Sequence, residues 1–317
     1  MKRIQLLCGA CALMTLVANA EKSGDAARDK MDYCDVYGAT EDGLTFVRFG
    51  EPKGDPQKAW QWQNAAQSIV ITNQIIFRAE DRAAFRNPQD LSFVEHIAPW
   101  GAYAKFLFCC EGGAFGQMDF RFTRRLEMYG TVDGVPTSIT QFPKDTIFAL
   151  ACPKTGEIVL VDCAAHTCNS AKQPKKRFPF AGVNGVRWDA ARDCLWALGP
   201  KTLRKYTYAL KTTKEIAQVG EWDYTALAKD GRALCLSRDG RLRFLAGKKI
   251  VMFDPEAKKF SVAGACEAGL KNYAPSIRGD LRFVPGEEVP VGDARYVVKG
   301  LRFAAACIQP VPTVDIH

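Results

Sequence analysis

The stretch from Gly182 to Tyr208, GVNGVRWDAARDCLWALGPKTLRKYTY, decides the fold. An apolar run leads into a polar turn at Asp189–Asp193, and a second apolar run covers Cys194–Leu198. A turn at Gly199–Lys201 then precedes an alternating run at Leu203–Tyr208. Short apolar runs separated by tight turns are typical of antiparallel strands joined by hairpins. The stretch therefore predicts three of the four strands of one small meander sheet.

The same pattern recurs along the chain at a nearly constant spacing. The expected starts of successive first strands, 45, 47, 40 and 51 residues apart, are Ser92, Thr137, Asn184, Tyr224 and Pro275. Repeats of this length built from four short strands are typical of β-propellers. Residues 31–77 supply one more repeat. The sequence thus predicts an all-β fold, a six-bladed β-propeller of four-stranded antiparallel sheets. A sandwich or a barrel is the alternative, but neither explains the repeat.

The first twenty residues have the pattern of a secretory signal peptide. Lys2 and Arg3 precede the uncharged run Ile4–Val17, and Ala18–Ala20 supplies small residues for cleavage before Glu21. The run is too short for a membrane anchor, whereas lipidation of a leader cysteine stays open. We expect residues 1–20 to be the leader and residues 21–317 to form a single propeller domain. The mature protein is then exported, periplasmic or extracellular, with no membrane span.

Charge gives little indication of a partner. Without Lys2 and Arg3 the formal charge of the chain is +6, which is mild for its length and spread along it. The densest basic cluster, Lys172 with Lys175–Arg177, lies beside prolines and is interpreted as a solvated loop. No nucleic-acid partner is expected.

Ten cysteines follow the leader, and their positions suggest different roles. Cys163 and Cys168 bracket a short loop, so a local disulfide is expected there. Cys109 and Cys110 are neighbours on one strand and should point to opposite faces of the sheet. Three others lie inside apolar runs and are expected to be buried free thiols: Cys152, Cys194 and Cys235. No set of ligands has zinc spacing, so no metal and no other cofactor is expected.

Several short motifs together resemble a known family. They are Cys34-Asp35, Trp60-x-Trp62, Phe85–Pro88, Gly112-Gly113, Trp188-Asp189, Leu195–Gly199 with Leu203-Arg204-x-Tyr206, and Phe253–Pro255 with Lys259-Phe260. The chain resembles an uncharacterised family of secreted bacterial six-bladed propellers, known only as a domain of unknown function. The resemblance implies the blade count and export, but no activity. The family's histidines at positions matching Thr137, Asn184 and Tyr224 are absent here, which puts an imidazole or metal site in doubt.

Candidate site residues follow from the propeller fold, because the innermost strands surround a central channel. Six polar or amphipathic residues at or near the starts of these strands are Thr137, Ser138, Asn184, Arg187, Tyr224 and Arg278. Arginines there suit carboxylate or sulfate groups, and a tyrosine suits stacking on a sugar. The alternative interpretation is that small polar residues simply hydrate a channel.

The function expected from these patterns is a secreted binding or scaffold module. Its ligand, a carbohydrate or a small anionic molecule, would lie at the channel mouth. One alternative is an enzyme such as a polysaccharide lyase, and another is a protein-interaction platform with an exposed apolar patch on its rim. The chain has three histidines, and no Ser-His-Asp triad is expected from them. Catalysis is therefore not favoured, although the sequence leaves it undecided.

Overall fold

The structure is a computed structural model. It describes residues 36–43, 45–49, 67–70, 81–98, 101–119, 125–142, 147–163, 175–209, 215–276, 279–297 and 300–308. The signal-peptide prediction for residues 1–20 lies outside this described part.

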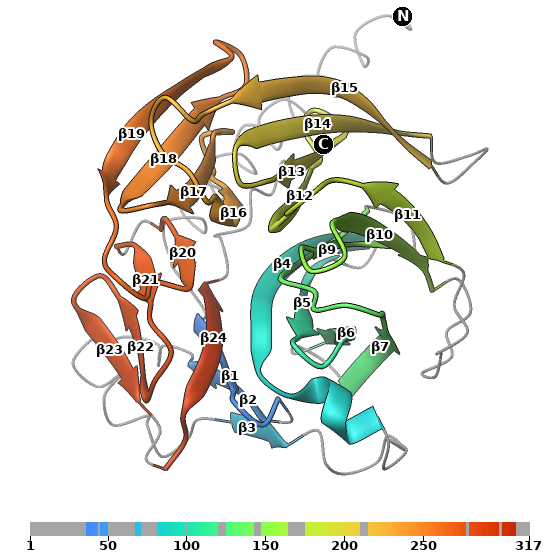
Figure 1. Ribbon diagram of the computed structural model, residues 1–317. Helices are drawn as coiled ribbons and strands as arrows, with labels where there is room; N and C mark the ends of the chain where they lie inside the picture. Colours follow the sequence, from blue (N-terminus) through green and yellow to red (C-terminus); the bar gives the residue numbers. More distant parts are fainter. Residues whose placement is uncertain are drawn as a thin grey trace, which may run out of the picture.

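The described strands pair into six four-stranded antiparallel sheets placed around a central axis (Figure 1). One sheet joins β4 (Pro88–Ala98), β5 (Gly101–Cys110), β6 (Ala114–Asp119) and β7 (Arg125–Thr131), and the next joins β8 (Ser138–Gln141), β9 (Ile147–Cys152), β10 (Glu157–Asp162) and β11 (Lys175–Pro179). A third joins β12 (Gly185–Asp189), β13 (Cys194–Leu198), β14 (Thr202–Ala209) and β15 (Glu215–Asp223), and a fourth joins β16 (Arg232–Leu236), β17 (Leu242–Ala246), β18 (Lys249–Asp254) and β19 (Lys259–Ala265). The remaining two join β20 (Asn272–Ala274), β21 (Leu281–Phe283), β22 (Glu288–Val291) and β23 (Ala294–Val297), and β24 (Phe303–Ile308), β1 (Val36–Thr40), β2 (Thr45–Phe49) and β3 (Gln67–Val70).

The first strand of each sheet contacts the first strand of the next one. The order runs from β4 through β8, β12, β16, β20 and β24, and then returns to β4. This arrangement surrounds a central channel and confirms the prediction of a β-propeller built from four-stranded antiparallel sheets. The helical turn expected at residues 79–86 is present as a short 3-10 helix, Asp81–Phe85.

The two ends of the described chain share one sheet. β24 is its innermost strand and pairs antiparallel with β1, for example Val36 with Ile308 and Gly38 with Ala306. Every residue of β24 is buried. We expected the run at residues 301–303 to belong to the last sequential repeat. Instead Phe303 begins β24, which closes the sheet begun by β1–β3, so the first and last described strands cover each other's edges.

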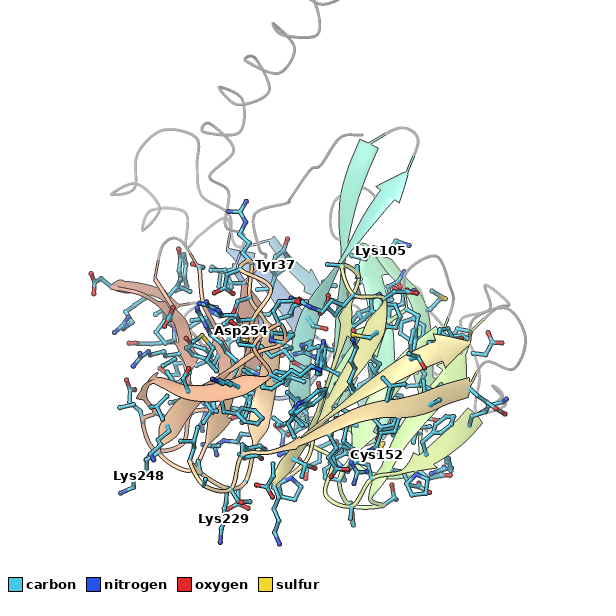
Figure 2. The ribbon with its side chains drawn as sticks, turned by 90° about the horizontal axis from the view of Figure 1, so that it is seen from above. Tyr37, Lys105, Cys152, Lys229, Lys248 and Asp254 are labelled. Carbon is cyan, nitrogen blue, oxygen red and sulfur yellow. The ribbon has the colours of Figure 1, made fainter. Side chains whose placement is uncertain are left out.

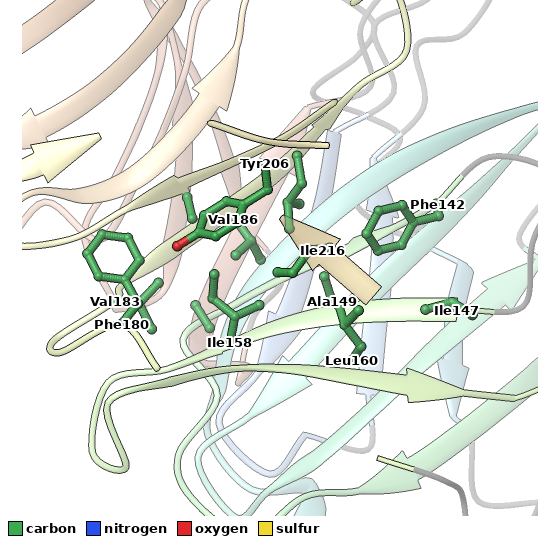
Figure 3. Close-up of a cluster of buried hydrophobic side chains, with 13 residues drawn as sticks. Phe142, Ile147, Ala149, Ile158, Leu160, Phe180, Val183, Val186, Tyr206 and Ile216 are labelled. Atoms are coloured by element: carbon green, nitrogen blue, oxygen red, sulfur yellow. The ribbon is translucent and has the colours of Figure 1, made fainter. Parts of the chain in front are cut away.

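The sheets are apolar on both faces, and this property makes them pack side by side. In β13, Leu195 and Ala197 belong to the core shared with β8–β11, while Cys194, Trp196 and Leu198 belong to the core shared with β16–β19. Figure 3 shows the first of these cores, in which Ile158 and Leu160 of β10 face Tyr206 and Ile216 of the neighbouring sheet. A fully buried large side chain contributes about 1.5–3 kcal/mol. Burial on both faces therefore stabilises the ring.

The channel has two distinct ends (Figure 2). The β4–β5 hairpin projects beyond the body of the molecule on one side, which we call the hairpin face, while Lys229, Lys248 and Cys152 lie toward the other side, the Lys248 face. Because Lys248 lies in the turn after β17, the turn before β17, Ser237–Arg241, is at the hairpin face. By the same reasoning Thr137, whose amide donates to Ala151 O at 2.9 Å next to Cys152, is at the Lys248 face.

Two local predictions were wrong. The expected strand at residues 224–228 is a turn, in which the Leu227 amide donates to Tyr224 O at 2.9 Å, and the first strand of that sheet is β16. The part of the expected basic loop that the structure describes, Lys175–Arg177, lies in the outer strand β11, whereas Lys172 lies outside the described residues. In β11, Lys176 forms an ion pair with Glu215 of β15 in the next sheet, and Arg177 forms one with Glu157 of the adjacent strand β10, so carboxylates compensate the basic side chains of this strand.

The cysteines agree with most of the expectations. Cys152, Cys194 and Cys235 are free thiols, the first two fully buried and Cys235 half-buried. Cys109 and Cys110 belong to different inter-sheet cores, as predicted. The expected Cys163–Cys168 disulfide stays a prediction, because Cys168 lies outside the described residues. In the described part of the chain, no helix is long and apolar enough to cross a membrane.

Candidate functional site

A cavity of about 450 Å³ occupies the channel toward the hairpin face. Residues from all six innermost strands line it, together with the turns that follow β12 and β16. Representative lining residues, one from each of these strands, are Asp90, Thr140, Arg187, Cys235, Asn272 and Cys307. Its volume is in the range of about 300–1,000 Å³ that is usual for small-molecule sites. The fold therefore places this cavity at one end of the channel.

An ion pair between Arg187 and Asp90 crosses the channel wall. The two guanidinium nitrogens Nη1 and Nη2 of Arg187 donate to the two carboxylate oxygens of Asp90 at 2.9 and 3.0 Å. Nη1 also lies 2.9 Å from Ser138 Oγ and 3.0 Å from Ile139 O. Ser138 Oγ and the Ile139 amide both donate to Asp90 Oδ2 at 3.0 Å. This network connects β4, β8 and β12.

The environment of Arg187 keeps it charged. Burial of the guanidinium lowers its pKa, but the adjacent and hydrogen-bonded Asp90 carboxylate more than offsets this, so the pKa lies above its ordinary value. The side chain of Arg187 is 16% exposed and that of Asp90 is 6% exposed. Two buried opposite charges held by several hydrogen bonds provide a rigid, preorganised part of the cavity wall.

A second arginine ties two turns together at the cavity rim. Arg192, in the turn after β12, donates from Nη1 to Asp189 Oδ2 at 2.9 Å and to Gly240 O at 3.1 Å, and its Nε donates to Glu256 at 3.1 Å. Gly240 has a φ of +73°, and a Cβ there would lie 3.2 Å from the Arg192 guanidinium. A glycine therefore allows the two turns to approach closely.

Arg238 is the third arginine of the cavity lining, and it differs from the other two. It is exposed in the turn after β16, and no hydrogen bond or ion pair involves it among the residues that the structure describes. The lining contains three arginines and two aspartates, Asp90 and Asp189. Because the two aspartates are paired with Arg187 and Arg192, the excess positive charge belongs to Arg238.

Two further lining residues carry buried polar atoms that have no hydrogen-bond partner within the described chain. These atoms are Ser237 Oγ and Trp188 Nε1. The side chain of Ser237 is among the buried ones, with 8% of the residue exposed. The indole of Trp188 packs against Phe142 at a ring-centroid distance of 4.7 Å and against Tyr208 at 6.5 Å. Buried polar atoms are usually hydrogen bonded, so these two atoms are exceptions among the lining residues.

The residues predicted from the starts of the inner strands separate into two groups. Arg187 lines the cavity, and Ser138 supports it through the Arg187–Asp90 network. Thr137 and Asn184 lie together at the Lys248 face, where Thr137 Oγ1 donates to Asn184 O at 3.4 Å, and neither lines the cavity. The cavity is therefore at the channel end opposite to Thr137 and Asn184, where we expected the ligand.

Tyr224, another predicted site residue, is not in the described cavity lining. Tyr224 is 1% exposed, its hydroxyl donates to Gly199 O at 2.5 Å and accepts from the Gly231 amide at 2.9 Å, and its ring packs on Phe244. These contacts give Tyr224 a structural role in joining two turns. Arg278 lies outside the described residues.

Sequence reasoning missed Asp90, Ser237 and Arg238. A signal for the last two was present, because Ser237-Arg238-Asp239-Gly240 is a polar turn directly after the apolar run of β16. The turn after β12, which begins at Asp189, follows the same pattern. Treating both ends of each inner strand as candidate mouths would have included these turns. Asp90 had no comparable signal, since its partner Arg187 is 97 residues away.

Within the described residues, no group of three or more His, Cys, Asp or Glu side chains could hold a metal ion. No family model matches the chain, and no curated protein matches it. The resemblance to the uncharacterised secreted family thus stays a prediction.

Solved structures similar to the chain include bacterial proteins of low sequence identity. A Bacteroides fragilis protein, provisionally assigned as a 6-phosphogluconolactonase, is 12% identical with a TM-score of 0.53, covering 88% of this chain and 99% of its own. A similarly assigned Bacteroides uniformis protein is 10% identical with a TM-score of 0.49, covering 88% and 100%. The periplasmic gluconolactonase of Pseudomonas aeruginosa is 12% identical with a TM-score of 0.46, covering 89% and 100%. The likeness to the Bacteroides fragilis protein shows a shared fold.

Proposed function

We propose that this protein is a binding module that holds a small anionic molecule in the cavity at the hairpin face. The observation that supports this proposal is the unpaired Arg238 at the rim of a cavity whose other charges are paired. Arginine is suited to carboxylate, sulfate and phosphate groups because its planar guanidinium donates two parallel hydrogen bonds. The rigid wall around Arg187 reduces the conformational entropy lost on binding.

The geometry favours binding over the lyase alternative. A lyase needs a base that loses its proton near neutral pH. Burial and the neighbouring Asp280 raise the pKa of Tyr273, the tyrosine of the cavity lining, to about 12. Arg187 also keeps its proton, as described above. Neither residue is therefore suited to be the general base.

The protein-interaction alternative predicts one contiguous apolar patch. In the described part of the chain, the exposed large hydrophobic residues are Val219, Val262 and Val284, which are 54%, 47% and 40% exposed. They belong to β15, to β19 and to the loop after β21, which are parts of three different sheets. They offer no common surface for a partner.

The binding proposal is tested by isothermal titration calorimetry with a panel of small carboxylates, sulfates and phosphates. At least one anion should bind saturably to the wild-type protein and about tenfold more weakly to Arg238→Gln. Arg86→Gln is the matched control, because Arg86 is also exposed and lies outside the cavity lining. Equal weakening in both variants would indicate a general charge effect and would contradict the assignment of Arg238.

We further propose that the six described sheets are the complete set of blades and that residues 21–317 form one exported propeller domain, as in the secreted family it resembles. The leader-like residues 1–20 support export, and an oxidising compartment would permit the Cys163–Cys168 disulfide. Mass spectrometry of the protein recovered from outside the cytoplasm tests the cleavage of the leader and the Cys163–Cys168 disulfide. A mature chain that begins at Glu21 and a linked 163–168 peptide are expected, and an uncleaved reduced chain would refute them.

A further inference from the structure

We infer that the ligand of this cavity is an organic anion with an apolar body, and that sugar acids are poor ligands. This inference rests on the binding function proposed above and narrows its ligand class. It depends on how few hydrogen-bonding groups in the described cavity wall are available.

Most polar side chains of the wall already have partners inside the protein. Ser92 Oγ donates to Ile139 O at 3.0 Å, and Thr140 Oγ1 accepts from the Trp188 amide at 3.1 Å. Asn272 Oδ1 accepts from the Ala306 amide at 3.1 Å, and the Tyr273 hydroxyl lies 3.0 Å from Asp280 Oδ2. The charged residues Arg187 and Arg192 are engaged as described above. These groups stabilise the blades around the cavity and leave little capacity for a ligand.

In the described lining, the side-chain groups without a partner include the Arg238 guanidinium, the amide nitrogen of Asn272, Ser237 Oγ and Trp188 Nε1, and the last two atoms are almost fully buried. Arg238 and Ser237 are neighbours in the turn after β16, and the exposed Arg238 guanidinium is the charged group that an anion can reach. A sugar acid brings several hydroxyls besides its carboxylate. A hydroxyl that leaves water and finds no partner lowers affinity, and a site with so few free partners leaves several hydroxyls unpaired.

The rest of the wall is suited to an apolar body. Leu91, Leu234, Leu236, Leu281 and Ile308 line the cavity beside the polar groups, and they come from four different strands, β4, β16, β21 and β24. Contact with these side chains removes apolar surface from water, which favours binding roughly in proportion to the area buried. The arrangement is an apolar chamber with a cationic rim, and it matches an amphipathic carboxylate.

Matched probes distinguish the two ligand classes by calorimetry. The apolar anions are phenylacetate, 3-cyclohexylpropanoate and octanoate, the sugar acids are glucuronate and gluconate, and phenylacetamide is the neutral analogue. At least one apolar anion should bind at least tenfold more tightly than either sugar acid. Phenylacetamide should bind at least tenfold more weakly than phenylacetate if phenylacetate is the anion that binds. Tighter binding of a sugar acid, lost in Arg238→Gln, would overturn this inference and leave the proposed function intact. Binding of no anion at all would overturn both.

Variants of the wall locate the apolar body. Leu236→Ser should lower the affinity for the apolar anion that binds the wild type most tightly by at least fivefold. Leu227→Ser is the matched control, because Leu227 is an equally half-buried leucine packed against the same core but lies outside the cavity lining. Ser237→Ala should also bind that anion more weakly than the wild type does. The melting temperature of this variant without ligand should equal that of the wild type or be higher. Unchanged affinity in both Leu236→Ser and Ser237→Ala would place the ligand elsewhere and overturn the inference.

Discussion

Arg187 and Asp90 form a buried ion pair in the wall of the described channel. They connect three sheets through one network, and both side chains are largely buried. The position of Arg187 on an inner strand was predictable from the alternation in its local sequence. Its partner was not, because β-strand patterns carry no information about which residue 97 positions away will lie opposite in space.

We expect the contribution of each charge to the free energy of unfolding to depend strongly on the presence of the other charge. Asp90→Ala and Arg187→Ala should each lower the free energy of unfolding by about 3–5 kcal/mol, because each leaves an unpaired buried charge. The double variant removes both charges, so its loss should be smaller than the sum of the two single losses by at least about 1 kcal/mol. Urea denaturation at neutral pH without ligand measures this cycle. Strictly additive losses would show that the two charges do not stabilise each other in the folded protein.

At the scale of the strand, the sequence was informative where apolar runs alternate with clear turns. The three strands predicted within residues 182–208 are β12, β13 and β14. The pattern misled where tertiary contacts determine the conformation. The Tyr224 hydroxyl is buried between two turns, and the segment 224–228, which we expected to be a strand, forms a turn. Glu215 and Glu157 pair with the basic residues Lys176 and Arg177 of β11, in a segment that we had interpreted as a loop.

The closing strand β24 allows a test of the ring. A chain that ends at Arg302 lacks β24, which exposes the inner edge of β1 and the faces that Phe303 and Ile308 cover. Loss of these contacts is comparable with the net stability of a domain, about 5–15 kcal/mol. This variant should lose cooperative thermal unfolding by circular dichroism and should associate on size-exclusion chromatography. A chain that ends at Ile308 keeps β24 and is the control. A cooperative, monomeric fold in the shorter chain would contradict the importance of this closure.

At the scale of the whole molecule, the stability of the ring is distributed over cores between neighbouring sheets, and several of these cores contain free thiols. Burial raises the pKa of Cys152 to about 12 from 9.0, and it likewise raises the pKa of Cys235 to about 12. The cysteines are predictable as core residues from their apolar surroundings. Their effect on pH dependence is visible only once the packing shows how completely they are buried.

These thiols predict a loss of stability in alkali. Between pH 9 and pH 12 the unfolded chain ionises Cys152 while the folded chain keeps it protonated, so the free energy of unfolding falls as pH rises. Each such thiol contributes at most about 1.4 kcal/mol per pH unit in this window. Cys152→Val, which has a similar volume and does not ionise, should match the wild type near pH 7.5 and be more stable than it at pH 10.5. Guanidinium denaturation at both pH values measures the difference, and identical alkaline slopes would refute the effect of Cys152.

The sequence by itself determined the all-β class, the repeat and many of the strands, because the alternation of apolar and polar residues and the turns between them are local properties. Only the tertiary structure decided how β24 closes the first sheet, which end of the channel is hollow, and which polar side chains remain available in it. These features depend on residues far apart in the chain, such as Asp90 and Arg187, and on which groups become hydrogen-bond partners when the sheets pack.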